Sequence, residues 1–419
     1  MTSLRITNVH LVDPETQTVT LGSLTINNGR ISGAGTADTL LDAEGQYLAP
    51  GIVDIGVKVC EPGERHKESF RSAGLAAAAG GVTTLVARPD TKPSVDSPET
   101  LEFASRRAQA NCIVHSYQMA ALTKGRLGRE MTEIGFLQDA GAIAFSDCDA
   151  VITDNKVLSR ALTYASQLGA LIIGHPQDPS LSKGASATSG KFASLRAIPA
   201  VSTMAERLGL ERDLAMVEMT GAKYHADQIS TVQALPALER AKAQGLDVTA
   251  GINIHHLTLN EFDVANYRSF FKVKPPLRSE NDRLAMVNAL ASGLIDTISS
   301  MHTPQDEESK RVPFEQAASG AVALETLLPA ALRLYHAEQL SLPQLFRALS
   351  LNPARRLGLT SGRLAVGAPA DLILFDPNIP FVLDRYKLKS KSKNTPFDGQ
   401  RMQGRVLATF VDGKKVYQL

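Results

Sequence analysis

The sequence has few of the features that mark secreted, membrane-spanning or nucleic-acid-binding proteins. It has no tryptophan and only 5% aromatic residues, so aromatic stacking platforms are scarce. Its three cysteines, Cys60, Cys112 and Cys148, show no Cys-x-x-Cys spacing, which argues against a zinc knuckle and predicts a reducing cytoplasm. The net charge of +1 gives no reason to expect nucleic acid or an anionic membrane as a partner. No apolar run approaches the ~18 residues of a membrane-spanning helix.

The chain is long enough for a large buried core. Its 419 residues are 43% hydrophobic and 21% charged, which is typical of a folded globular protein. This length exceeds one ordinary domain and fits a barrel of ~250 residues with a smaller accessory domain.

A unit of helix, glycine and short apolar strand recurs along the middle of the chain. Clear examples are helix 72–79 before strand 82–87, helix 157–168 before strand 170–173, helix 234–244 before strand 246–249, and helix 283–292 before strand 294–299. Alternating helices and strands predict a parallel sheet, and this number of units favours closure. We therefore expect an α/β fold with a (β/α)8 TIM-type barrel over residues 51–358.

The two ends of the chain have a different pattern. Residues 4–35 and 360–419 alternate apolar and polar residues between turn sequences such as Asn27-Asn28-Gly29 and Asp412-Gly413, and the corresponding domain parts are expected over 1–50 and 359–419. This alternation is typical of short antiparallel strands. Both ends are expected to meet in one small β-sandwich-like domain, with the barrel inserted between them.

The segment Val53 to Gly63 carries the most informative motif. It resembles the D-x-H-x-H-x-R-E-P-G signature of the dihydroorotase branch of the amidohydrolases. Asp54 and Glu61-Pro62-Gly63 match the signature, whereas Gly56 and Lys58 stand at its two histidines and Cys60 at its arginine.

Further motifs extend the resemblance to type I dihydroorotases over nearly the whole chain. In order, they are Ala77-Ala-Ala-Gly80-Gly81, Thr91-Lys92-Pro93, Phe145-Ser146-Asp147, Thr220-Gly221-Ala222, Ile229-Ser230-Thr231, His255-His256-Leu257, Pro275-Pro276-Leu277-Arg278, Asn352-Pro353-Ala354, Ala370-Asp371 and Asn394-Thr395-Pro396-Phe397. The resemblance implies a zinc centre that opens or closes a cyclic amide. In that chemistry a metal-bound hydroxide attacks the ring carbonyl, and an aspartate on the last barrel strand carries the proton.

Most of the metal positions that the resemblance implies are replaced in this chain. They fall on Gly56, Lys58, Cys148, Gln228 and Met301, and only His175 matches a ligand. A glycine has no donor atom, a lysine cation repels zinc, and a thioether cannot carry the proton of the aspartate expected at Met301. The sequence therefore predicts no zinc and no catalytic residue.

The positions that should hold the substrate are replaced as well. They fall on Cys60, Asp90 and Lys274, so the forked arginine clamp on a carboxylate is lost. A hypothesis follows from the new charges: Lys58 or Lys274 pairs with Asp90 and fills the vacated metal position.

The preferred interpretation is a pseudoenzyme of pyrimidine biosynthesis. The chain looks most like the non-catalytic dihydroorotase-like subunit that accompanies aspartate carbamoyltransferase in some bacteria. That resemblance implies the transferase catalytic chain as partner, in a mixed dodecamer-type assembly. The losses concentrate at strand ends, whereas structural motifs such as Gly80-Gly81 remain, which suggests that the folded shape is still needed.

Two other interpretations stay open. The first is a metal-remodelled cyclic-amide hydrolase of the dihydroorotase or hydantoinase type, in which His175, His225 and His302 rebuild a metal centre or Cys60 acts as nucleophile. The second is a sensor that binds a small ligand in the vacated pocket.

Overall fold

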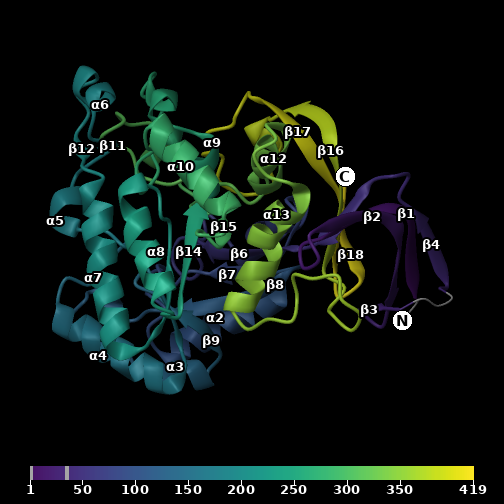
Figure 1. Ribbon diagram of the computed structural model, residues 1–419, viewed down its shortest axis with the longest axis horizontal. Helices are drawn as coiled ribbons and strands as arrows, with labels where there is room; N and C mark the ends of the chain where they lie inside the picture. Colours follow the sequence, from purple (N-terminus) through teal and green to yellow (C-terminus); the bar gives the residue numbers. More distant parts are fainter. Residues whose placement is uncertain (1–2, 34–36) are drawn as a thin grey trace.

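Eight parallel strands form the centre of this computed structural model, which describes residues 3–33 and 37–419. In chain order they are β6 (Ile52–Val57), β7 (Val82–Ala87), β8 (His115–Ala120), β9 (Ala142–Phe145), β10 (Leu171–Gly174), β13 (Lys223–Ala226), β14 (Val248–Asn253) and β15 (Thr297–Ser299). Each strand pairs in parallel with the next one in this order. The predicted fold class, a TIM-type barrel with a β-domain built from both ends, is confirmed (Figure 1).

Hydrogen bonds bring the first and last barrel strands together. The buried carboxylate of Asp54 on β6 accepts hydrogen bonds from the backbone and the hydroxyl of Ser300, directly after β15. The Lys58 amide donates to the carbonyl of His302 at 2.9 Å. Asp54 therefore has a structural role, which explains its presence beside the replaced ligands.

Helices surround the barrel, and Figure 1 shows α3, α4, α7 and α8 side by side on its outer face. The long helices are α1 (Phe70–Ala79), α2 (Pro98–Asn111), α4 (Asn155–Leu168), α7 (Met204–Thr220), α8 (Leu235–Ala243), α10 (Glu280–Ala291) and α12 (Leu327–His336). Shorter ones are α3 (Ile134–Asp139), α5 (Pro179–Ser182), α6 (Lys191–Leu195), α9 (Ile254–Thr258), α11 (Glu307–Lys310), α13 (Leu342–Phe346) and α14 (Asn352–Arg356). In the part of the chain that is described, no helix is long and apolar enough to cross a membrane.

Both ends of the chain contribute to a second eight-stranded sheet. Its strands are β1 (Leu4–Asp13), β2 (Thr18–Asn27), β3 (Arg30–Ser32), β4 (Thr39–Asp42), β5 (Tyr47–Pro50), β16 (Leu372–Val382), β17 (Arg401–Val411) and β18 (Lys414–Gln418). A short two-stranded sheet, β11 (Ala187–Thr188) with β12 (Ala200–Val201), lies apart from it. The two ends join where β5 pairs antiparallel with β16, Pro50 opposite Leu372. The exact domain limits, 1–50, 51–358 and 359–419, stay a prediction.

A buried ion pair connects four segments of the chain. Glu206 on α7 and Arg278 are 1% and 2% exposed, and Arg278 Nη2 lies 3.2 Å from Glu206 Oε2. The same carboxylate accepts hydrogen bonds from the backbone and hydroxyl groups of Ser230 and Thr231. Arg278 also donates to the hydroxyls of Ser230 and Thr188. Both charged groups are thus buried, paired with each other and hydrogen-bonded to neighbouring hydroxyl and amide groups, which offsets the cost of burying an ion pair.

Candidate functional site

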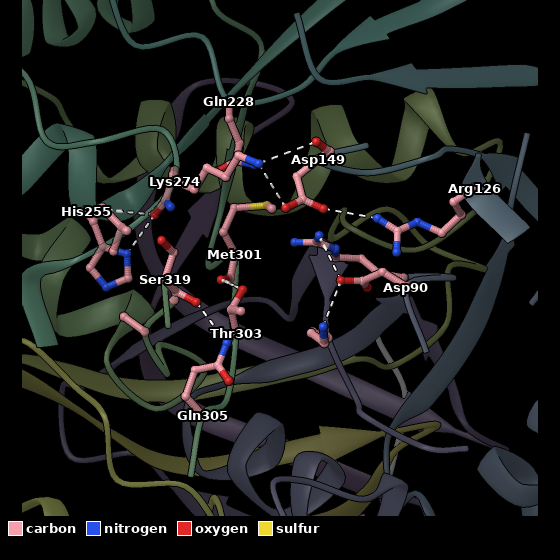
Figure 2. A pocket seen from close by; sticks show the side chains of 16 residues that line it. Asp90, Arg126, Asp149, Gln228, His255, Lys274, Met301, Thr303, Gln305 and Ser319 are labelled. Carbon is pink, nitrogen blue, oxygen red and sulfur yellow. Dashed lines mark hydrogen bonds and ion pairs between the residues drawn. The ribbon is translucent and has the colours of Figure 1, made fainter. Parts of the chain in front are cut away.

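A cavity of about 170 Å³ opens at the carboxyl ends of the barrel strands, where the active sites of such barrels lie. Its lining side chains come from most of the strand ends: Lys58 after β6, Arg88 and Asp90 after β7, Arg126 after β8, Asp149 after β9, Gln228 after β13, Asn253 at the end of β14, and Met301 after β15. We call this cavity the mouth pocket (Figure 2). The cavity thus lies at the end of the barrel where the sequence predicted the site.

Three side chains at the ends of β6 and β7 form what we call the inner centre: Lys58, Asp90 and Arg88. Asp90 Oδ2 lies 3.1 Å from Lys58 Nζ and 3.1 Å from Arg88 Nη2. Burial by itself disfavours the charge on Lys58, but Asp90 outweighs it and raises the lysine pKa above its ordinary value. The hypothesis that Lys58 pairs with Asp90 is confirmed.

A second group, the outer centre, consists of Arg126, Asp149 and Lys274. Asp149 lies between the two cations, 3.0 Å from Arg126 Nη2 and 3.2 Å from Lys274 Nζ (Figure 2). Burial tends to raise the pKa of Asp149, but Lys274 and Arg88 hold it well below the ordinary value. Lys274 thus pairs with Asp149 and not with Asp90. The lining of the mouth pocket contains four cationic side chains and two carboxylates.

The loop that carries Arg126 is held rigidly. Asp147, after β9, accepts hydrogen bonds from the backbone amides of Leu122 and Thr123, both at 2.9 Å. Arg126 in turn donates from Nε and Nη2 to the Asp147 carbonyl at 3.1 and 3.0 Å. No motif in the sequence pointed to Arg126, because its position depends on this loop contact and not on the strand pattern.

Two of the replaced metal positions fit each other. Gly56 has a positive φ of 106°, and a Cβ atom there would lie only 2.8 Å from the sulfur of Met301. The thioether of Met301 therefore occupies the space beside Gly56. A side chain at position 56 would require the thioether of Met301 to move.

The backbone at several replaced positions has an uncommon conformation. Cys60, Cys148, Gln228 and Met301 all have positive φ angles, of 62°, 52°, 58° and 46°. For residues other than glycine this conformation costs on the order of 1–3 kcal/mol and persists where the surroundings impose it, often at functional sites. The strand ends therefore keep a strained backbone although the side chains have changed.

Of the remaining positions, His175 and Cys60 are buried and Cys148 is partly buried. His175 lines a second cavity of about 40 Å³ together with Cys148. Burial lowers the pKa of His175 to about 3, and neither of its ring nitrogens has a hydrogen-bond partner. Burial raises the pKa of the Cys60 thiol to about 12, so Cys60 is not an activated nucleophile.

The donor atoms at the mouth do not fit a zinc ion, which needs neutral histidines, thiolates or carboxylates. Lys58 and Arg88 place positive charge there instead. Across residues 3–33 and 37–419, one set of three potential ligands lies close enough to share an ion: His115, Asp371 and Asp412. His115 begins β8, so this set lies at the opposite end of the strands from the mouth pocket.

The three histidines considered for a rebuilt metal centre do not meet. His225 has its Nδ1 atom 2.8 Å from the Thr249 hydroxyl, and burial lowers its pKa to about 3. His302 has Nε2 3.3 Å from Glu68 Oε2. Both therefore have structural partners of their own, and neither belongs to a metal-binding set with His175 among the described residues.

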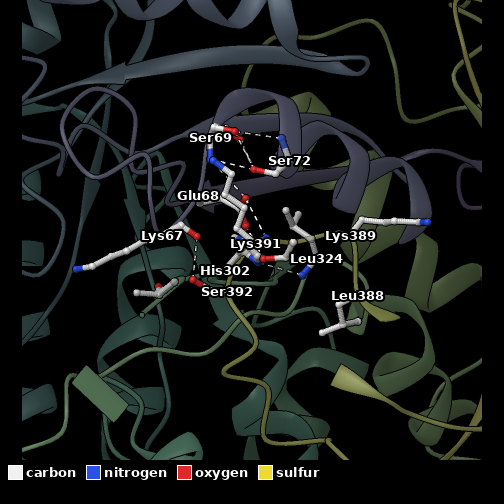
Figure 3. A network of polar contacts seen from close by, with 12 residues as sticks. Lys67, Glu68, Ser69, Ser72, His302, Leu324, Leu388, Lys389, Lys391 and Ser392 are labelled. Carbon is white, nitrogen blue, oxygen red and sulfur yellow. Dashed lines mark hydrogen bonds and ion pairs between the residues drawn. The ribbon is translucent and has the colours of Figure 1, made fainter. Parts of the chain in front are cut away.

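The Glu68–His302 contact belongs to a buried network that joins four segments (Figure 3). His302 Nδ1 accepts from the Ala323 amide at 3.1 Å, so the proton of the neutral ring lies on Nε2 and points to Glu68. The hydroxyl of Ser390 also donates to Glu68. Burial opposes ionisation of Glu68, but the bond from His302 helps to lower its pKa below the ordinary value. The network holds the segment after β16 against the mouth of the barrel.

Asp227, directly after β13, is a candidate that the sequence did not single out. It lines an inner cavity of about 10 Å³ together with Gly56, Arg88 and Gln228, and that volume is close to the room one water needs. Arg88 and Gln228 also line the mouth pocket. Burial raises the pKa of Asp227 to about 7, against the opposing effect of Arg88. A carboxyl that titrates near neutral pH beside a cavity is a typical acid–base group.

The chain is similar to known dihydroorotases in sequence and to a hydantoinase in fold. A family model described as dihydro-orotase-like matches residues 45–234, and one described as an amidohydrolase family matches residues 317–417. The chain is 38% identical to the dihydroorotase of Wolbachia sp. subsp. Drosophila simulans, over 98% of this chain and 95% of that protein. It is 38% identical to the dihydroorotase of Syntrophus aciditrophicus, over 97% of each chain. The L-hydantoinase of Arthrobacter aurescens superposes with a TM-score of 0.90 at 25% identity, covering 100% and 96% of the two chains.

These comparisons overturn two expectations that rested on the replaced ligands. The prediction that the chain is not an enzyme is wrong, because relatives that match it over the full length are named dihydroorotases. The prediction that zinc has no role is wrong on the same ground, because a zinc centre is what the resemblance implies for such relatives. The physical reason is that a replaced ligand shows only which side chain is missing. It does not show which reaction the present set of side chains can carry out. The mouth residues still do not supply a fitting set of donors, so no catalytic step below passes through the metal.

Proposed function

The chain belongs to the dihydroorotase family, and on that basis we propose that it opens or closes the ring of a cyclic amide that carries a carboxylate. The observation that supports this proposal is the charge of the mouth pocket, whose lining has four cations and two carboxylates. Such a pocket attracts and orients an anion. Its volume of about 170 Å³ lies below the range of drug-sized pockets, which limits the substrate to a small molecule.

The side chains of the mouth pocket and of the adjoining inner cavity can divide the reaction between them. In the ring-opening direction, a water beside Asp227 attacks the ring carbonyl carbon while the Asp227 carboxylate takes one of its protons. The carbonyl oxygen becomes an anion that faces Lys58 and Arg88, whose positive charges stabilise it. The ring carbon–nitrogen bond then breaks, and the nitrogen receives the proton held by Asp227. One water is consumed, and a second carboxyl group is formed.

Turnover of an anionic substrate tests this proposal. We expect the purified chain to open dihydroorotate, and to favour it over dihydrouracil, the neutral ring without a carboxylate, by at least about tenfold in kcat/KM. A hydrogen bond to a charged group contributes about 1.5 kcal/mol or more, and 1.4 kcal/mol corresponds to a factor of ten. The loss of dihydroorotate can be followed in the ultraviolet, with the protein as purified and after addition of zinc. The absence of turnover under both conditions and in both directions contradicts the proposal.

We also propose a partner, the catalytic chain of an aspartate carbamoyltransferase, in a mixed dodecamer-type assembly. This proposal is supported by the resemblance of the sequence to the transferase-associated subunit, and an assembly of this kind does not require an inactive subunit. We expect native mass spectrometry of the two chains expressed together to give one complex that contains both. Two separate homo-oligomers at micromolar concentration contradict the pairing.

A further inference from the structure

The two charged centres of the mouth pocket have the same composition. In each, one carboxylate is shared by two cations: Asp90 by Lys58 and Arg88, and Asp149 by Arg126 and Lys274. Each centre thus keeps one positive charge that no side chain in the lining of the pocket balances. Two separate positive centres on the wall of one small cavity are the pattern that recognises two negative groups on one ligand.

The cations of the outer centre keep hydrogen-bond donors that their contacts with Asp149 and the Asp147 carbonyl do not use. Arg126 uses Nε and Nη2 for the Asp147 carbonyl and for Asp149, which leaves donors on Nη1 of its planar guanidinium. Lys274 has three N–H donors, and its described hydrogen bonds all go to Asp149. Asp149 pairs with both cations and the Asp147 carbonyl also binds Arg126, which reduces the conformational freedom that a ligand would have to remove on binding.

Several residues that line the same pocket have buried polar atoms without hydrogen-bond partners. Arg88 is 9% exposed, and its Nε has no hydrogen-bond partner; neither have Asp90 Oδ1, Gln228 Oε1 and His255 Nε2. All four residues line the mouth pocket. Buried groups of this kind are normally satisfied. Their concentration here is independent support for a ligand that reaches past the outer centre to the inner one.

We propose that Arg126 and Lys274, bridged by Asp149, form the carboxylate-binding centre of the mouth pocket, and that the inner centre takes a second negative group. The outer centre stands on loops after β8, β9 and β14, and we propose that it takes over from the arginine clamp that is lost at Cys60. The pocket is therefore a dianion site. This inference rests on the proposed function in one respect: ring opening of an anionic cyclic amide creates a second carboxylate at the carbonyl carbon, which is the group placed at Lys58 and Arg88.

Binding of simple anions tests the inference without any need for turnover. We expect succinate to bind at least about tenfold more tightly than butyrate, which has the same chain length and a single carboxylate, by isothermal titration calorimetry at low ionic strength. Lys274→Met should weaken succinate to about the level of butyrate. Lys156→Met removes the same charge from the start of α4, outside the pocket lining, and should leave both affinities unchanged.

Each result has a defined meaning. Equal binding of succinate and butyrate overturns the inference, and so does succinate binding that is unaffected by Lys274→Met. Inorganic phosphate serves as the other source of a double negative charge. If phosphate binds more tightly than succinate and is lost only in Lys58→Met, the pocket is a one-centre phosphate site and the inference is wrong. A chain that binds succinate as expected but opens no ring contradicts the proposed function and leaves this inference standing.

Discussion

Replacing Asp227 with asparagine is expected to lower the rate of ring opening by at least about a hundredfold without unfolding the chain. General acid–base catalysis contributes on the order of 10²–10⁴ in rate, and an amide of the same shape cannot accept the proton from water. Asp227 lines the water-sized inner cavity, so the substitution changes the proton acceptor and little else. The loss should appear in kcat more than in KM, because the cations that bind the substrate remain.

The pH dependence separates a catalytic role from a structural one. With a pKa of about 7 for Asp227, the carboxylate form that acts as base is lost as pH falls through neutrality. Ring opening by the original chain should therefore decline below about pH 7, and this limb should disappear from the residual activity of Asp227→Asn. Asp139→Asn makes the same change at an exposed residue of α3 and should leave rate and profile unchanged. An Asp227→Asn protein with unaltered kcat and pH profile would rule out the assignment.

Replacing Arg278 with methionine is expected to destabilise the fold by about 3–5 kcal/mol, the usual cost of leaving one partner of a buried ion pair uncompensated. Glu206 would remain at 1% exposure with hydroxyl and amide donors but no cationic partner. A lower denaturation midpoint in urea, followed by far-ultraviolet circular dichroism, measures the loss.

Two further variants make this result specific. Arg207→Met breaks a much more exposed pair with Glu211 on the same helix, and should cost less than about 1 kcal/mol. Adding Glu206→Gln to Arg278→Met removes the orphaned charge while keeping an acceptor for Ser230 and Thr231, and should recover part of the stability. An Arg278→Met protein as stable as the original would show that the buried charge is compensated in another way.

The fold could be predicted because local rules determine where its elements end. The sequence predicted a helix over 157–168, and α4 spans Asn155–Leu168. Its end was predictable because Gly169 takes a left-handed φ of 64°, which suits glycine. Its start was missed by two residues because the Asp154 side chain caps the amides of Lys156 and Val157, a local signal that the apolar periodicity does not show.

Contacts in the site could be predicted only between residues that directly follow neighbouring, paired strands. Lys58 and Asp90 follow β6 and β7, which pair directly, so their contact follows from strand order. Asp149 meets Arg126 and Lys274 through loops whose course the strand pattern does not determine, and these contacts were missed. Asp227 was missed because the motif directed attention to His225 and Gln228 on either side of it.

The wrong conclusion about activity has a related cause. The replaced positions were judged one at a time as lost ligands, although Gly56 and Met301 fit each other sterically and Lys58 and Asp90 fit each other in charge. Such coupled changes describe a pocket that has been rebuilt. Comparing the sequence with the motif one position at a time shows which ligands are lost. Only the three-dimensional arrangement shows that the replacing residues contact each other.

The pairing of β5 with β16 has a consequence for how the chain is made. These two strands lie about 320 residues apart in the sequence, and a ribosome adds roughly 5–20 residues per second. The edge of β5 that pairs with β16 therefore remains unpaired for roughly 15–60 s during translation, while the barrel between the two strands is still being synthesised. An unpaired strand edge is a template for association with other chains. The β-domain is thus the last part of the molecule that can be completed, although synthesis begins with it.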